Sequence, residues 1–203
     1  MRTSWMVFGL SLTLFAAPLN AADATQAAVA EDKAQALEEK VVEEAPPPKK
    51  SETLTPTDVQ AVDPKGHAPM DDSITCLART LYWEAKGADS DDMSAVANVV
   101  LNRLGHDGFP DTICGVVKQG VESRNCQFSW WCDGRPDQVE EPGRYEIAKE
   151  IARKALNQQL KDRTGGAMYF HDRNVHPSWA KAYRKTAETR HFLFYKPNQA
   201  LAR

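Results

Sequence analysis

Apolar residues between positions 71 and 160 recur at the three- and four-residue spacing that is typical of amphipathic helices. The first predicted helix begins at Asp71-Asp72-Ser73, whose side chains can cap it, and ends at Gly87. A second helix is predicted from Ser90 to Leu104, with two aspartates in its first turn, where the helix dipole favours negative charge. The apolar face of the first helix is formed by Ile74, Leu77, Ala78, Leu81, Tyr82 and Ala85.

The rest of the chain predicts further helices and a small β element. A short helix is expected over residues 111–119, a longer one from Pro142 toward Leu160, and another that Pro177 opens. Two short aromatic segments, residues 168–171 and 191–195, suit strands that pair with each other. We therefore expect a mainly helical domain with a small β element, and we see no internal repeat.

The first 70 residues have a different character. Residues 1–21 contain a positive N-terminal end, an apolar run and then small residues, as a cleaved secretory signal peptide does. The apolar run is shorter than the roughly 20 residues of a spanning helix, so no transmembrane anchor is expected after cleavage; a retained anchor is the alternative. Residues 22–70 hold six of the twelve prolines and no aromatic residue or cysteine, which predicts a disordered linker ahead of a domain at 71–203.

Charge divides the chain at the same place. The 203 residues carry a net charge of -3, but residues 23–70 contain ten acids and five bases, whereas residues 71–203 contain 18 acids and 19 bases. The acidic part is thus the linker, and the domain is nearly neutral. A domain without a bulk basic field gives no reason to expect a nucleic-acid partner.

Four cysteines lie behind the predicted signal peptide, where disulfides are the default expectation. Three pairings are possible. One of them closes a small loop between Cys126 and Cys132 and leaves Cys76 and Cys114 to join the first helix to the third. Zinc is the rival interpretation, but the sequence has no CxxC pair and no HExxH motif, so we expect no metal and no other cofactor.

Glu84 is the candidate catalytic residue. It lies on the flank of the apolar face of the first helix, where a carboxyl can face a cleft while apolar neighbours desolvate it. Desolvation raises the pKa of a carboxyl group, as a general acid that works near neutrality requires. By spacing alone, an ordinary surface glutamate near a helix end is the better explanation, because helices contain many such residues.

Residues 77–120 resemble the SleB-type cell wall hydrolase family. The resemblance is carried by Tyr82-x-Glu84-Ala85-x-Gly87, by a following helix that ends in Val100-Leu101-Asn102-Arg103, and by Phe109-Pro110-x-Thr112-Ile113-Cys114. Cys126-Gln127-Phe128-Ser129 extends it, and residues 167–180 resemble the family's Gram-negative, cysteine-containing members. The resemblance implies a small lysozyme-like domain that degrades peptidoglycan glycan strands, with Glu84 in the family's catalytic position.

The resemblance also implies a mechanism, lytic transglycosylase cleavage of the bond between MurNAc and GlcNAc. Glu84 would protonate the glycosidic oxygen and then take the proton of the MurNAc C6 hydroxyl group. Ordinary glycosidases use two carboxyl groups. Asp133 is the best candidate for a second carboxyl group here, although an Asp-Gly turn explains this residue equally well. Expected substrate contacts are Tyr82, Trp83, Gln127, Ser129, Trp130, Tyr169 and His171; Phe128, His176 and His191 are expected to be structural or exposed.

Two alternatives remain open at this point. One is a metal-dependent amidase that cuts the bond between MurNAc and the peptide, with zinc held by His171, His176 or His191 and a carboxylate. The other is a wall-binding module that keeps the fold without catalysis. In either case we expect an exported protein of the periplasm, because a signal peptide precedes a block that resembles Gram-negative members.

Overall fold

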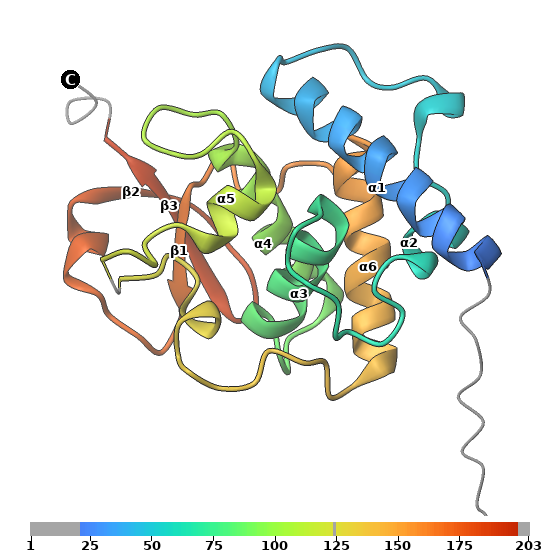
Figure 1. Ribbon diagram of the computed structural model, residues 1–203. Coiled ribbons are helices and arrows are strands. Elements are labelled where there is room, and N and C mark those ends of the chain that lie inside the picture. The colour runs from blue at the N-terminus through green and yellow to red at the C-terminus, as the bar shows by residue number, and fades with distance from the viewer. Residues whose placement is uncertain (1–20, 124, 199–203) are drawn as a thin grey trace, which may run out of the picture.

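A computed structural model describes residues 21–123 and 125–198. Helices form one side of the molecule, and a small antiparallel sheet lies against them (Figure 1). The central helices are α3 (Ser73–Glu84), α4 (Ser90–Arg103), α5 (Ile113–Lys118) and α6 (Pro142–Leu156). The first three begin close to the predicted residues, while the fourth ends at Leu156, before the predicted Leu160.

Side chains at the N-termini start these helices, and apolar faces hold them together. Asp72 accepts a hydrogen bond from the backbone N–H of Thr75 at 2.8 Å, and Asp89 accepts two from the first turn of α4 at 3.0 Å. α3 packs against α4, α5 and α6. The fully buried side chains at these contacts include Ile74, Leu77, Leu81, Val96, Val100, Ile113, Ala148 and Ala152.

The sheet has the strand order β1-β3-β2. β1 (Tyr169–Asp172) and β3 (Phe192–Pro197) pair antiparallel, which confirms the two predicted strands and their pairing. The helix expected after Pro177 is wrong: one 3-10 turn (Ser178–Lys181) is followed by β2 (Tyr183–Glu188) on the other edge of β3. The backbone hydrogen bonds that β3 offers on that edge outweigh the weak helical spacing of this polar segment.

The disordered linker predicted for residues 22–70 is also wrong in the described residues. α1 (Ala21–Val42) lies along the helical side, and α2 (Pro56–Ala61) follows it (Figure 1). The inward side of α1 repeats at alternating steps of three and four residues, the spacing of a narrow helix-packing seam. It consists of Ala27, Ala30, Ala34, Leu37 and Val41, of which Ala30, Ala34 and Leu37 are buried.

Polar contacts also attach this N-terminal segment to the domain. The Asn157 side chain brackets the backbone of Leu54, accepting from its N–H at 2.8 Å and donating to its carbonyl at 2.9 Å. The Asp63 carboxylate accepts from the Arg79 guanidinium at 3.0 Å and from the Tyr145 hydroxyl at 2.8 Å, and both acid and base are buried. The folded body therefore begins well before residue 71.

The predicted signal peptide, residues 1–21, lies outside the described residues except for Ala21, where α1 begins. Within the described part of the chain, no helix combines the length and the apolar character needed to cross a membrane.

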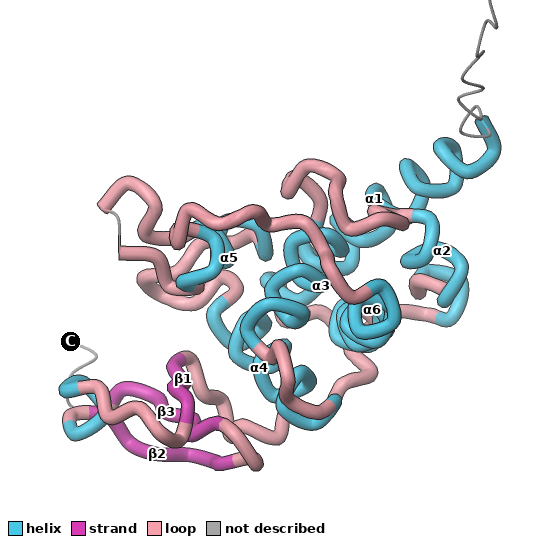
Figure 2. Tube along the Cα trace, turned by 90° about the horizontal axis from the view of Figure 1, so that it is seen from below, coloured by secondary structure: helices cyan, strands magenta, loops and turns pink. Residues whose placement is uncertain are grey.

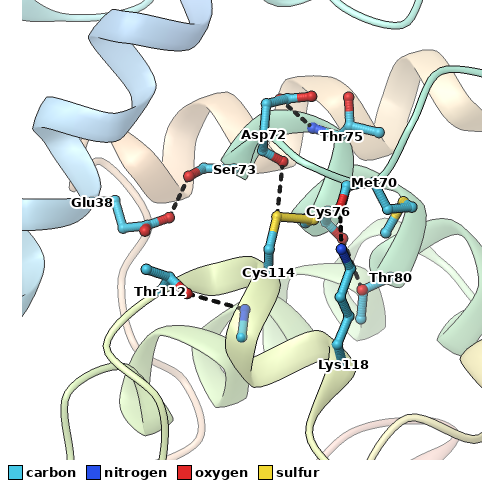
Figure 3. The surroundings of a disulfide bond; sticks show 11 residues. Glu38, Met70, Asp72, Ser73, Thr75, Cys76, Thr80, Thr112, Cys114 and Lys118 are labelled. Carbon is cyan, nitrogen blue, oxygen red and sulfur yellow. Dashed lines mark hydrogen bonds between the residues drawn. A yellow bond between two sulfur atoms is a disulfide. The ribbon is translucent and has the colours of Figure 1, made fainter. Parts of the chain in front are cut away.

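All four cysteines form disulfides, which confirms two bonds and selects one of the three pairings. Cys76–Cys114 joins α3 to α5 with 5.3 Å between the Cα atoms (Figure 3). Cys126–Cys132 closes a short loop with a Cα separation of 6.2 Å. Beside the first bond, Ser73 donates to the Glu38 carboxylate, which joins α1 to α3.

Candidate active site

A cleft lies between the helices and the sheet and has a volume of about 740 Å³. Its walls come from the end of α3, the Arg103 end of α4, the loop at residues 125–129 and strand β1. A second hollow of about 370 Å³, lined in part by Trp83, Trp130 and Arg135, shares Glu84, Lys86 and Ser129 with the cleft. Glu84 therefore lies where the two hollows meet, with room for an extended substrate on both sides.

Glu84 is the last residue of α3 and is half-buried at this junction. Burial raises the pKa of its carboxyl group to about 7, and the positive charge of Arg103 opposes part of that rise. Within the described residues no hydrogen bond to the Glu84 carboxyl group is found. A carboxyl group in such a place is still partly protonated at neutral pH and can donate its proton to a ligand.

Arg103 lines the cleft and acts on the charge of Glu84, but among the described residues the two form no ion pair. Its side chain is buried, and its Nε donates to the carbonyl of Met168 at 2.7 Å. The guanidinium carbon lies 5.1–5.6 Å from the ring centres of Phe109, Phe128 and Tyr169. Burial lowers the pKa of Arg103 to about 10, so the group is still a cation at neutral pH and acts on Glu84 through its field.

The two aromatic residues beside Glu84 have different places. Tyr82 is fully buried, and its hydroxyl accepts hydrogen bonds from the backbone N–H groups of Glu140 and Glu141 at 3.1 and 3.2 Å. The substrate contact expected of Tyr82 is therefore not supported, because the ring belongs to the core. Trp83 lines the second hollow, where its Nε1 donates to the carbonyl of Asp137 at 3.2 Å and the Lys86 ammonium lies 4.4 Å from its ring centre.

The loop bounded by Cys126 and Cys132 supplies one wall of both hollows. Gln127 and Ser129 line the cleft, and Trp130 lines the second hollow although it is only 7% exposed. Phe128 is fully buried in the core, as expected. The disulfide closes the ends of this loop and so restricts the directions in which its side chains point.

The sheet supplies the opposite wall. Tyr169 and His171 lie two positions apart on β1, which places both on one face, and both line the cleft. His171 Nε2 is 3.1 Å from the Tyr195 hydroxyl oxygen. Trp179 and Tyr183 complete an aromatic cluster, with 4.8 Å between the ring centres of Tyr169 and Tyr183. Aromatic rings that line a cleft are suited to contact with the apolar faces of sugars.

Several cleft residues were not predicted from the sequence. Arg103 carries no signal of its own at a helix end, and Trp179 and Tyr183 fell in the segment wrongly expected to be helical. His191 was expected to be structural or exposed, yet it lines the cleft as well, whereas His176 is exposed and does not. A strand assignment for residues 183–188 was the signal needed for Tyr183, since it pairs this segment with β3.

Comparison with known proteins identifies the family. A model of the cell wall hydrolase family matches residues 87–195, more than half of the chain. The chain belongs to the cell wall hydrolase family. This membership makes it an enzyme of that kind, and it is consistent with a peptidoglycan substrate and action at the cell wall.

Curated relatives of this cell wall hydrolase are spore cortex-lytic enzymes. The one from Halalkalibacterium halodurans is 34% identical over 111 residues, which cover 53% of this chain and 28% of the relative. The one from Bacillus cereus is 32% identical over 109 residues, covering 53% and 36%. The chain thus aligns with only about a third of these relatives' length.

Two solved structures are also similar to this cell wall hydrolase. The catalytic domain of the Bacillus cereus SleB protein has a TM-score of 0.48 at 26% identity and is matched over 61% of this chain and 89% of its own. The catalytic domain of the germination-specific lytic transglycosylase SleB from Bacillus anthracis has a TM-score of 0.49 at 25% identity, over 64% and 98%.

Proposed function

We propose that this cell wall hydrolase cleaves the glycosidic bond between MurNAc and GlcNAc in peptidoglycan, as a lytic transglycosylase with Glu84 as general acid and base. The observation that carries the proposal is the position of Glu84 at the junction of two hollows, where burial raises its pKa to about 7. A glycan strand laid through both hollows presents one glycosidic oxygen at that junction. The resemblance of residues 77–120 to the SleB-type family supports the choice of substrate.

In the proposed reaction, protonated Glu84 donates its proton to the glycosidic oxygen while the bond to MurNAc C1 breaks. Positive charge develops on the MurNAc ring as the GlcNAc hydroxyl leaves. The Glu84 carboxylate then removes the proton of the MurNAc C6 hydroxyl, and that oxygen bonds to C1 to close a 1,6-anhydro ring. Glu84 is protonated again at the end, and no water is consumed.

The other acidic residues that line the two hollows are consistent with a reaction that uses one carboxyl group. Asp133 accepts from the backbone N–H of Arg135 at 2.8 Å, and Asp172 accepts from that of Asn174 at 2.8 Å, so each stabilises its own turn. Asp137 lines the second hollow, and burial and the charge of Asp133 raise the pKa of its carboxyl group. Asp137 is thus the acid to test as a second carboxylate, which hydrolysis would require.

Arg103 and the cleft walls have supporting roles in this proposal. When Glu84 gives up its proton, the field of Arg103 stabilises the resulting carboxylate, an interaction that strengthens as the reaction proceeds. Gln127 and Ser129 offer hydrogen bonds to acetamido groups, and Trp83, Trp130 and Tyr169 offer ring faces to sugars. We place the enzyme in the periplasm after removal of an N-terminal signal peptide; the segment concerned lies outside the described residues.

Digestion of purified peptidoglycan by the wild type, Glu84→Gln and Asp137→Asn tests the proposal, with products identified by mass spectrometry. We expect anhydro-MurNAc ends from the wild type and from Asp137→Asn, and none from Glu84→Gln. Reducing ends that disappear in Asp137→Asn would indicate a two-carboxylate hydrolase instead. Free stem peptides would indicate an amidase, and binding without products would indicate a non-catalytic module.

A further inference from the structure

Asp92 and His191 form a hydrogen-bonded pair at the edge of the cleft. Asp92 lies in the first turn of α4, and its side chain is fully buried. His191 directly precedes β3, and its Nδ1 lies 2.6 Å from the Asp92 carboxylate. The imidazole is 38% exposed and lines the same cleft as Glu84.

The contact with Asp92 defines which nitrogen of the His191 ring carries a proton. Although burial raises the pKa of Asp92, hydrogen bonds from the Thr189 and His191 side chains outweigh burial, and the pKa lies below its usual range. Asp92 is therefore a carboxylate that accepts, so Nδ1 of His191 carries a proton and donates it. The neutral ring then has its lone pair on Nε2.

Nε2 of His191 has no hydrogen-bond partner among the residues that the structure describes. The backbone of His191 is held as well, since its N–H reaches Asp92 at 3.4 Å and its carbonyl accepts from the Arg173 N–H at 2.8 Å. A fixed ring with a free acceptor in a substrate cleft is a preorganised binding group, because little freedom is lost when a ligand binds.

The pair helps to attach α4 to the sheet. Asp92 and Arg103 are eleven residues apart, about 16 Å along a helix axis. Arg103 bonds to the carbonyl before β1, and Asp92 bonds to the residue before β3, so both ends of α4 are attached to the sheet. Arg103 and His191 both line the cleft, so each of these attachments contributes one residue to its walls.

We propose that His191 is a substrate-binding residue whose Nε2 accepts a hydrogen bond from a hydroxyl or acetamido N–H group of the glycan strand, and that Asp92 is the residue that positions it. The inference rests on the proposed function for the identity of the strand. It adds a recognition point on the wall of the cleft that Glu84 also lines. It also explains why a buried carboxylate, which is costly to desolvate, stands at this place in α4.

His191→Asn separates this role from a merely structural one. The asparagine amide N–H takes the place of Nδ1–H and keeps the bond to Asp92, but it has no atom at the position of Nε2. We expect the fold to persist and binding to purified peptidoglycan sacculi to weaken roughly three- to tenfold, the effect of one hydrogen bond. The loss should be found in KM rather than in kcat. His176→Asn, at an exposed histidine outside the cleft, is the matched control and should bind as the wild type does.

Asp92→Asn tests the positioning role, because its amide donates to Nδ1, moves the proton to Nε2 and replaces the acceptor with a donor. It should weaken binding as His191→Asn does. Binding is compared in the Glu84→Gln background as well, so that loss of turnover and loss of binding are read separately. Turnover that survives Glu84→Gln would reject the proposed function, while the binding comparison would still judge His191.

Wild-type affinity of His191→Asn for sacculi would overturn the inference and leave the pair as a structural link between α4 and the sheet. If the variants do not fold, imidazole ¹⁵N spectra of the wild type decide the matter. The His191 Nε2 resonance should shift when a GlcNAc–MurNAc tetrasaccharide is added; an unchanged resonance at saturation would reject the proposal.

Discussion

At the scale of single residues, the cleft places a desolvated acid beside a cation without letting them pair. A direct ion pair would hold Glu84 ionised and remove its proton from use. Arg103 is kept apart by its bond to the Met168 carbonyl and by three aromatic rings. The pKa of Glu84 therefore remains near 7, where proton donation and recovery are both accessible.

Removal of the charge at Arg103 should change the pH profile of cleavage in a defined direction. The acid is active when protonated, so activity of the wild type falls as the pH rises through about 7. Arg103→Gln removes the group that lowers the pKa of Glu84, so the alkaline limb of kcat/KM should move to higher pH while the maximum falls by roughly 10- to 100-fold.

Arg103→Lys is the matched variant for this measurement, since it keeps the charge and loses the planar guanidinium. Its alkaline limb should stay near that of the wild type even if its rate is lower. An alkaline limb that is unchanged in Arg103→Gln would show that Arg103 does not act on Glu84 through its field.

At the scale of secondary-structure elements, α1 is held to the domain by small side chains. Alanines at the seam let the helix approach α3 and α6 closely, and Leu37 is the largest side chain buried there. Ion pairs of Lys33 with Asp58 at 3.1 Å and of Lys40 with Glu52 at 2.7 Å connect α1 to the segment that follows it. α1 and α2 lie at the end of the molecule away from the sheet in both views (Figures 1 and 2). No described residue of either helix lines the cleft.

Leu37→Ala tests whether α1 is a packed part of the fold. The substitution opens a cavity at the seam and should lower the free energy of unfolding by about 2–5 kcal/mol, measured by denaturant titration. Val29→Ala, at a residue of the same helix that is 53% exposed, should change it by less than about 0.5 kcal/mol. Equal, small effects of both substitutions would mean that α1 contributes no packing to stability.

At the scale of the whole molecule, two disulfides reinforce the body at different points. Cys76–Cys114 spans 38 residues and joins two helices of the core, whereas Cys126–Cys132 spans 6 and restrains one wall of the site. Closing a longer loop removes more entropy from the unfolded chain. The first bond should therefore matter more for stability, and the second for the shape of the cleft.

Double alanine variants at each pair measure this division. We expect loss of Cys76–Cys114 to cost about 4 kcal/mol and loss of Cys126–Cys132 about 2 kcal/mol in the free energy of unfolding. The second variant should lose more activity than the first when both are assayed at a temperature where they are folded. The reverse order of the stability effects would contradict the assignment.

The sequence by itself determined the helices of the core, the paired strands and the place of Glu84. Periodic apolar residues and capping side chains act within one turn of a helix, so α3 and α4 could be located from local pattern alone. The prediction for α1 was wrong because it relied on composition, which indicated disorder. The alternating three- and four-residue spacing of the seam residues was nevertheless present in the sequence.

Only the tertiary structure decided what surrounds Glu84. The Arg103 cation, the Trp179 and Tyr183 rings and the Asp92–His191 pair come from segments as many as 99 residues apart in the chain. β2 formed where local spacing suggested a helix, because an edge of β3 was available to pair with it. Desolvation, fields and strand pairing depend on neighbours that the fold brings together, and no local pattern of residues specifies those neighbours.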